Sequence, residues 1–387
     1  MLVQTVKSSR RQVIGVLILA VAGVLTWAAA AAFQAGRSDA SDAWGPFHTA
    51  MPVEERKLSD WAPGLLGTAG DTGVFILRGP EPGGTALVLG GTHADEPAGV
   101  VAAVLLLETA QVRQGTLIII PRANQSAATH GLPQEGHPAG FVIRTADGER
   151  RFRVGARVTN PVHQWPDPEV YVEPTSRQEL AGMEARNLNR AYPGRDDGNL
   201  TQRIAYAITN LIQTEGVDLA VDLHEASPEY PVVNAIVAHP RAMDLAAWSV
   251  IMLEMEGLSY NLEPSPEQLR GLSHREWGDN TDALAVLMET ANPVQGRLRG
   301  VTNEALIITG ADPLYEQADA VGRLYAPYPE GGYSLDWRVA RHVTGLKTLF
   351  STMGDLDPEQ ALHVSGVPSY EEIVTLGVGA YLGKEAP

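Results

Sequence analysis

Two histidines and one glutamate are the residues of this chain whose types and spacing could hold a metal ion. His93 and Glu96 lie in Gly90-Gly91-Thr92-His93-Ala94-Asp95-Glu96, and His224 ends Asp222-Leu223-His224 much later in the chain. Zinc hydrolases often use two imidazoles and one carboxylate, which leave a fourth position for a water whose pKa the metal lowers to roughly 7. These residues predict one zinc ion per chain and a hydrolytic reaction.

Apolar runs that predict buried strands precede both parts of this ligand set. Thr85 to Gly90 precedes His93, and Pro97 suits the first turn of a helix that follows Glu96. His224 ends a second such run. Ligands of open α/β sheets bind at the carboxyl ends of the strands, so we expect the three side chains to meet at one edge. Asp222 lies two residues before His224, so strand alternation places its carboxylate on the same face, where it could support the site.

Four segments occur in a characteristic order along the chain: Gly91 to Glu96, Pro121 to Asn124, Arg186 to Gly194, and Asp222 to His224. With them the chain resembles a known family, the succinylglutamate desuccinylase and aspartoacylase group within the zinc metallocarboxypeptidase superfamily. The resemblance covers roughly residues 75 to 295, and a glutamate near the end of a late strand in the family fits Glu289.

Three positions depart from the pattern of this family. Asn187 stands where an aspartate is usual, Tyr192 where phenylalanine is usual, and Gln125 where proline commonly follows the asparagine. None of these changes removes an expected metal ligand. The resemblance therefore still implies a zinc site made by His93, Glu96 and His224.

Further roles can be assigned from the chemistry of the matched side chains. Glu289 is the candidate base that takes a proton from the attacking water, with a surface ion pair as its alternative role. Asn189 and Arg190 are expected to bind a substrate carboxylate, since a guanidinium forms a planar fork that fits it; a structural salt bridge is the alternative for Arg190. Arg186 is expected to stabilise the developing oxyanion. Glu225 could line the pocket or orient the adjacent ligand.

The pattern of apolar runs predicts an α/β fold: a mixed, mostly parallel, twisted sheet sandwiched by helices, as in zinc carboxypeptidases. A further helix is expected to start at Ser265, and the tail is expected to be helical, whereas aspartoacylase-like enzymes carry a carboxy-terminal β domain there. The clearest expected helices are 97 to 109, 200 to 214 and 241 to 255, and the expected tail helices are 336 to 350, 357 to 363 and 369 to 382.

The chain is expected to divide into three parts. Residues 1–36 form a signal peptide or membrane anchor, 37–60 a linker and entry segment, and 61–387 the hydrolase domain with its helical tail. The stretch from about 131 to 181 is rich in Gly, Pro, Asp and Arg and interrupts the matched motifs. It is expected to form a hairpin or loop along one wall of the cleft, with a plain surface excursion as the alternative.

The amino-terminal segment indicates where in the cell the protein is located. Val13 to Phe33 carries no charge and follows Lys7, Arg10 and Arg11. Its length suits a membrane-spanning helix, and the positive charge before it predicts that the domain beyond lies outside the cytoplasm, on the periplasmic or extracellular side. The flank also resembles a twin-arginine export signal, although a plain basic flank is the favoured explanation. Cleavage as a signal peptide and retention as an anchor both stay open.

The composition of the chain excludes some classes of binding partner and metal ligand. A net charge of −17 argues against nucleic acid, and the absence of cysteine leaves only nitrogen and oxygen ligands for zinc. We expect a zinc-dependent hydrolase that cleaves an amide next to a free carboxylate, in an acyl amino acid or a short peptide. Membrane contact would come through the amino-terminal segment if that is retained. The alternative is a membrane-tethered binding protein that keeps the fold without catalysis.

Overall fold

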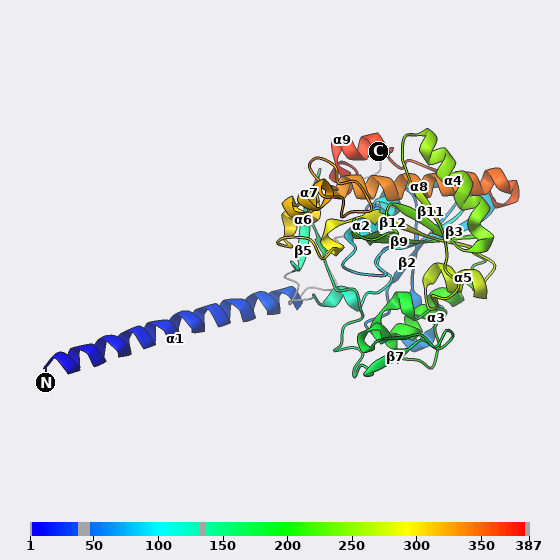
Figure 1. Ribbon diagram of the computed structural model, residues 1–387. Coiled ribbons are helices and arrows are strands. Elements are labelled where there is room, and N and C mark those ends of the chain that lie inside the picture. The colour runs from blue at the N-terminus through cyan, green and yellow to red at the C-terminus, as the bar shows by residue number, and fades with distance from the viewer. Residues whose placement is uncertain (1, 38–46, 132–136, 384–387) are drawn as a thin grey trace.

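The computed structural model describes residues 2–37, 47–131 and 137–383. Its first helix, α1 (Leu2–Arg37), extends away from the rest of the chain (Figure 1). Among the described residues, the segment Arg10–Ala31 is the one helical stretch long and apolar enough to cross a membrane, with a mean hydropathy of 2.4. A signal sequence near an amino terminus has the same properties, so the choice between signal and anchor stays a prediction.

A mixed sheet forms the centre of the remaining chain. Its strands follow the order β1-β2-β4-β3-β9-β12-β10-β11, and β13 pairs with β4. The four central strands β4, β3, β9 and β12 run parallel, while β1, β2, β10 and β13 each join a neighbour antiparallel. The bounds are β1 Glu54–Lys57, β2 Gly73–Arg78, β3 Glu81–Leu89, β4 Gln111–Ile120, β9 Leu219–Ala226, β10 Ala235–Ala238, β11 Asn261–Pro264, β12 Leu284–Ala291 and β13 His363–Ser365.

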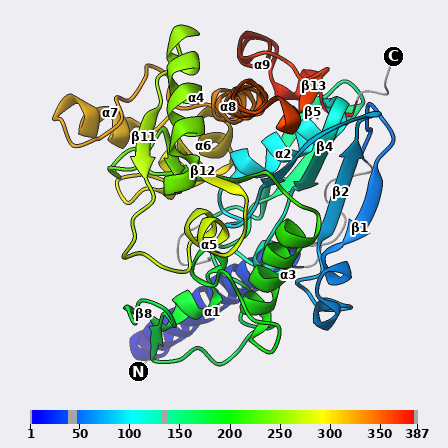
Figure 2. The ribbon, with the colours of Figure 1, turned by 90° about the vertical axis from the view of Figure 1, so that its right-hand side faces the viewer.

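Helices cover both faces of this sheet, which confirms the predicted α/β fold class (Figure 2). Helices α2, α4 and α8 pack on one face in one hydrophobic core, and α3 and α5 pack on the other face in a second core. Central strands are buried on both faces, which explains why runs such as Leu117-Ile118-Ile119-Ile120 are continuously apolar. The bounds are α2 Pro97–Thr109, α3 Leu200–Thr214, α4 Met243–Met255, α5 Ser273–Asn280, α6 Glu304–Thr309, α7 Pro313–Ala320, α8 Leu335–Leu356 and α9 Tyr370–Leu376.

The tail is partly helical, as expected, and partly not. Helix α8 is longer than predicted, and α9 begins at the expected cap, where Ser369 and Glu372 form a capping box. The helix predicted over 357 to 363 is wrong: a short 3₁₀ turn, Pro358–Gln360, is followed by strand β13 against β4. The backbone N–H and C=O groups of 363–365 form hydrogen bonds with β4, so this segment does not need the hydrogen bonds of a helix.

The helix predicted to start at Ser265 is also wrong. Residues 265–272 form a loop after β11, and α5 begins at Ser273. The side chain of Arg275 donates to the Ser265 hydroxyl at 3.1 Å and also to the Ser265 carbonyl. Ser265 is therefore held by a tertiary contact, whereas the sequence signal had suggested a local helix cap.

Two short hairpins lie in the insertion between about 131 and 181. Strands β5 (Gly140–Thr145) and β6 (Gly148–Arg153) form the first, and β7 (Val170–Val172) and β8 (Glu179–Ala181) form the second. The backbone N–H of Val142 in the first hairpin donates to Glu304 of α6 at 2.7 Å. This hairpin therefore packs against the carboxy-terminal part of the chain, and a role of the insertion in specificity stays a prediction.

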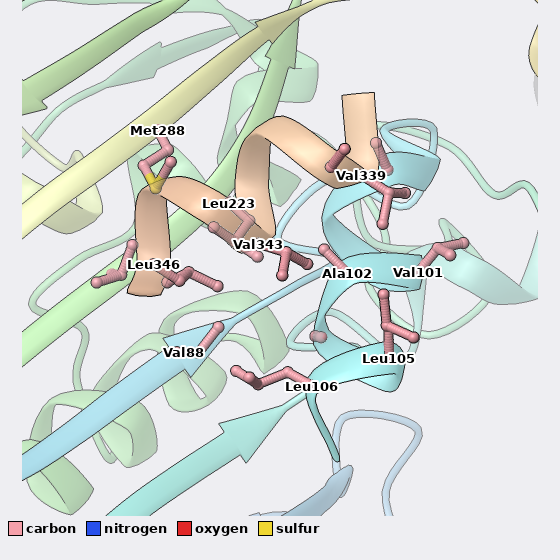
Figure 3. Close-up of a cluster of buried hydrophobic side chains, with 14 of the residues drawn as sticks. Val88, Val101, Ala102, Leu105, Leu106, Leu223, Met288, Val339, Val343 and Leu346 are labelled. Atoms are coloured by element: carbon pink, nitrogen blue, oxygen red, sulfur yellow. The ribbon is translucent and has the colours of Figure 1, made fainter. Parts of the chain in front are cut away.

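The tail helix α8 belongs to the main core. Figure 3 shows Val339, Val343 and Leu346 of this helix pointing toward side chains of α2 and of strands β3, β9 and β12. All three are fully buried. Helix α8 therefore lies over the central strands and covers the same core as α2.

Replacing Leu346 by alanine should destabilise the protein by about 2–5 kcal/mol, because a buried leucine leaves a cavity that the surrounding core only partly fills. Chemical denaturation followed by tryptophan fluorescence measures this loss. Leu356→Ala on the same helix is the matched control, since Leu356 is 49% exposed. Equal and small effects in both variants would show that α8 does not form part of the core.

Candidate metal centre

The three expected ligands come from two neighbouring strands. His93 and Glu96 lie in the turn between β3 and α2, and His224 lies in β9, which pairs with β3. The turn needs a glycine at Gly91, which has a φ of +68°, and a Cβ there would lie 3.1 Å from the Cα of Arg122. Glu96 is the last residue before α2, whose first position is Pro97. Local backbone geometry thus directs His93 and Glu96 to the strand edge.

The ligand side chains converge on the carboxylate of Glu96. Nδ1 of His93 lies 2.8 Å from Oε1 of Glu96, and Nδ1 of His224 lies 2.9 Å from Oε2. All three residues are buried, and their possible ligand atoms lie within 4.8 Å of one another. The structure therefore brings together the three residues predicted to bind zinc.

Hydrogen bonding around His93 fits a cation bound at its Nδ1. Its Nε2 lies 3.0 Å from Oδ1 of Asn187, which also accepts the backbone N–H of Asn189 and is therefore an acceptor. Burial lowers the pKa of His93 to about 4, so the ring is neutral at pH 7 and carries one proton. With that proton on Nε2, a lone pair on Nδ1 faces the Glu96 carboxylate. The Nδ1 lone pair and the carboxylate repel each other, and a cation bound between them would remove this repulsion.

His224 has a carboxylate on its other side. Its Nε2 lies 2.9 Å from Oδ2 of Asp222, as strand alternation predicted, and Oδ1 of Asp222 accepts the hydroxyl of Thr92 at 2.8 Å. Burial opposes a charge on His224, but the Asp222 and Glu96 carboxylates outweigh it and raise its pKa well above the usual value. A carboxylate behind a ligating imidazole fixes the ring orientation and raises its basicity. The set of two nitrogens and one oxygen fits zinc.

Glu289 lies beside the ligand set on the next strand. In the parallel pair β9 and β12, Glu289 is the register partner of His224, so both side chains lie on the same face. Its Oε2 is buried and has no hydrogen-bond partner among the described residues. Burial raises the pKa of Glu289 to about 8, against the opposing charge of His224. A carboxylate with these properties is suited to proton transfer near neutral pH.

Arg157 is a site residue that the sequence analysis missed. Its Nη1 lies 3.0 Å from Oε1 of Glu96, while 39% of its side chain stays exposed. The carboxylates of Glu96, Asp95 and Glu184 raise its pKa, although burial opposes its charge. Arg157 lies in the insertion and belongs to no recognisable motif, so nothing in the sequence separated it from the other arginines. Arg157 directly follows Gly155-Ala156, whose backbone pairs with that of Ala94, and this tertiary pairing has no sequence signal.

Arg190 and Asn189 lie at the same site. Burial lowers the pKa of Arg190, and the nearby charge of Arg157 adds to that effect while Glu184 opposes it. Nη1 of Arg190 donates to the carbonyl of Asn189 at 2.6 Å, and its Nε lies 3.8 Å from Glu184. The Asn189 side-chain oxygen accepts the backbone N–H of Ser273 at 2.8 Å. Arg190 is 28% exposed and loosely paired, so its guanidinium can donate hydrogen bonds to another anion.

Arg186 makes contacts of a different kind. Its Nε and Nη2 bind the two oxygens of Asp167 at 2.7 and 2.9 Å, and its Nη1 donates to the carbonyl of Thr159 at 2.5 Å. These contacts occupy the guanidinium and favour a structural role. The role of Arg186 in stabilising an oxyanion stays a prediction.

Comparisons with known proteins give a partial match. No family model matches the chain. It is 26% identical to N-alpha-acetyl-L-2,4-diaminobutyric acid deacetylase of Halomonas elongata over 166 residues, which are 42% of this chain and 34% of that protein. The match thus spans about a third of the length of this curated relative, and the activity, substrates and partners of the whole protein are proposals.

Solved structures with low similarity include members of two enzyme groups. A succinylglutamate desuccinylase from Silicibacter sp. TM1040 is 23% identical, with a TM-score of 0.38, over 58% of this chain and 55% of that chain. A metallo-carboxypeptidase from Burkholderia cenocepacia is 12% identical, with a TM-score of 0.44, over 84% of this chain and 68% of that chain. The names of these proteins belong to the same groups of enzymes that the four motifs resemble.

Replacing His224 by alanine should abolish metal retention, because it removes one of three ligands and leaves Glu96 with a single imidazole. Elemental mass spectrometry of the purified full-length protein measures zinc per chain, and about one zinc is expected in the wild type. His363→Ala is a control for a histidine outside the ligand set, since His363 is exposed in β13. Zinc retained in His224→Ala would remove this residue from the ligand set.

Proposed function

We propose that this chain, which resembles the succinylglutamate desuccinylase and aspartoacylase group, is a zinc-dependent hydrolase that cleaves an amide next to a free carboxylate. One observation carries the proposal: the Nδ1 atoms of His93 and His224 meet at the Glu96 carboxylate, and their Nε2 atoms face acceptors. Such an arrangement leaves the inner nitrogens to bind a metal. Glu289, which is half-buried and has a buried Oε2, lies beside this set.

Bound zinc would polarise the amide carbonyl and lower the pKa of a water molecule at the site. Glu289 takes the proton from this water as it attacks the carbonyl carbon, and then delivers the proton to the leaving nitrogen as the amide bond breaks. The carboxylate of Glu289 thus serves both steps. Its position next to His224 in the register keeps it within the same small volume as the ligand set.

Two arginines supply the positive charge that the reaction needs. Arg157 is partly exposed and next to Glu96, so it can stabilise negative charge that develops on the carbonyl oxygen. Arg190 binds the free carboxylate of the substrate, with Asn189 beside it. The contacts of Arg186 with Asp167 hold the wall of the site, which makes Arg157 the better candidate for the oxyanion role.

The substrate class is an acyl amino acid or a short peptide. A single pair of accessible cations, Arg157 and Arg190, suits a small anionic substrate. The partial match to a deacetylase supports an acyl amino acid. The apolar amino-terminal helix supports a domain that acts outside the cytoplasm, where peptides are available. The N-terminal segment would connect the domain to the membrane if it is not cleaved.

A non-catalytic, membrane-tethered binding protein is the second candidate. The apolar helix α1 supports the tether. Against loss of catalysis, the chain keeps all three candidate ligands and also Glu289, a half-buried glutamate whose Oε2 is buried and has no hydrogen-bond partner among the described residues. Burying an unpaired carboxylate oxygen is costly, and a function in proton transfer accounts for its presence.

Glu289→Gln should keep zinc and lower kcat by roughly 10²–10⁴, because the amide has the shape of the carboxylate but cannot take the proton. Hydrolysis of a panel of N-acetyl amino acids and short peptides, measured together with zinc content, checks this. Glu263→Gln in the edge strand β11 is a control for glutamate loss away from the site. Full turnover by the Glu289 variant would exclude the proposed base, whereas a wild type that binds zinc but cleaves no member of the panel would favour the binding protein.

Arg190→Ala should lower kcat/KM for substrates with a free carboxylate by roughly tenfold to a hundredfold, the value of a hydrogen bond between charged groups. Steady-state kinetics with a carboxylate substrate and its amidated analogue separate this role from a general defect. The analogue should lose little. Arg195→Ala is the matched control, because Arg195 is an exposed arginine paired with Asp197. Equal losses on both substrates would contradict carboxylate binding by Arg190.

A further inference from the structure

We propose that Arg338, in the tail helix α8, is a positioning residue of the metal centre that acts through Glu225. The inference rests on the proposed zinc site and extends it to a part of the chain beyond the matched motifs. Glu225 directly follows the ligand His224, and Arg338 lies in a helix that packs over the central strands. The guanidinium of Arg338 donates to Oε1 of Glu225 at 2.6 Å.

Glu225 connects the two segments that carry the ligands. Its backbone N–H donates to Oε2 of the ligand Glu96 at 3.1 Å. Its side-chain Oε2 accepts the backbone N–H of Ala98, in the first turn of α2, at 2.9 Å. The end of β9 and the start of α2 are therefore held together by one residue, and a shift of Glu225 would move Glu96 relative to His224.

Arg338 in turn fixes the carboxylate of Glu225. Both side chains are 0% exposed, so neither charge has water to solvate it. The other two nitrogens of Arg338 also donate: Nη2 donates to the carbonyl of Ile307 in α6, and Nε donates to the carbonyl of Ser334 at 3.4 Å. The guanidinium thus has a fixed position, and the carboxylate it holds has one too.

Stability alone is a poor explanation for this pair. Desolvation of a fully buried ion pair can exceed the Coulombic gain, and apolar replacements of similar volume are often neutral or stabilising. Groups behind a metal ligand, by contrast, commonly change metal affinity by 10- to 100-fold when they are removed. The position of Glu225 between Glu96 and His224 favours this second role.

The same helix offers a matched comparison. Arg341 is also buried, but its Nη2 donates to the carbonyl of Ser259 at 2.7 Å and its guanidinium lies over the rings of Tyr260 and Trp337. None of these contacts is to a segment that carries a metal ligand. A change at Arg341 therefore tests the loss of a buried arginine from α8 without touching Glu225.

The experiment measures zinc affinity of the full-length protein by competition with a chromogenic chelator, and the visible spectrum after replacement of zinc by cobalt(II). Far-UV circular dichroism verifies the fold of each variant. Arg338→Met should weaken zinc binding by roughly 10- to 100-fold and change the cobalt spectrum, because the ligands lose their fixed geometry. Arg341→Met should lower the thermal midpoint and leave zinc affinity and the cobalt spectrum unchanged.

Two further variants keep the test decisive. Arg338→Lys retains a cation near Glu225 but loses the planar fork that also reaches Ile307, so its zinc affinity should fall between those of the wild type and the methionine variant. The double variant Glu225→Gln with Arg338→Met removes both buried charges, while the glutamine can still accept the Ala98 N–H. It should bind zinc more tightly than Arg338→Met alone, which would show coupling between the two residues.

The outcomes separate this inference from the proposed function. Folded Arg338→Met with the zinc affinity and cobalt spectrum of the wild type would overturn the positioning role while leaving the zinc site intact. If the methionine variant does not fold, the lysine variant decides: weaker zinc binding supports the role, and wild-type binding overturns it. A wild-type protein that binds no zinc would overturn the proposed function and this inference with it.

Discussion

The carboxylate of Glu96 is the group on which the site depends. One oxygen lies near His93 and Arg157, and the other lies near His224 and the backbone N–H of Glu225. A buried carboxylate is stable only when such partners compensate its lost hydration. The partners of the Glu96 carboxylate therefore come from the turn between β3 and α2, from β9 and from the insertion, and they all lie around this one group.

The layers of the fold serve this arrangement. Parallel strands β3, β9 and β12 present their carboxyl ends at the same edge, so residues far apart in the chain become neighbours there. Helices α2 and α8 cover one face of these strands, with Val101 and Val343 among the side chains of their shared core (Figure 3). Close-packed protein cores resist displacement, and the turn that carries His93 and Glu96 connects β3 and α2, which both belong to this core.

The polar groups around the site fall into two sets. In the first set, Asp222 lies beside Nε2 of His224 and Asn187 lies beside Nε2 of His93. In the second set, Arg157 and Arg190 remain partly exposed, and Glu289 has an oxygen without a hydrogen-bond partner among the described residues. Groups that orient the candidate ligands thus lie directly against them, whereas groups that could meet a substrate are partly exposed or keep an unused acceptor. This contrast is what the proposed hydrolytic function needs.

The sequence by itself determined the candidate ligand set, the class of fold, the strands before His93 and at His224, and several helices, because apolar runs and short motifs report on local burial and on strand ends. Asp222 could be predicted to support His224 from strand alternation alone. Only the tertiary structure decided which arginine lies beside Glu96, since Arg157 comes from an insertion whose path no local pattern describes. It also decided that 363–365 form a strand, because the partner strand β4 lies far away in the sequence. The contact of Arg338 with Glu225 is of the same kind: its two residues are separated by much of the chain, and only the packing of α8 over β9 brings their charges together.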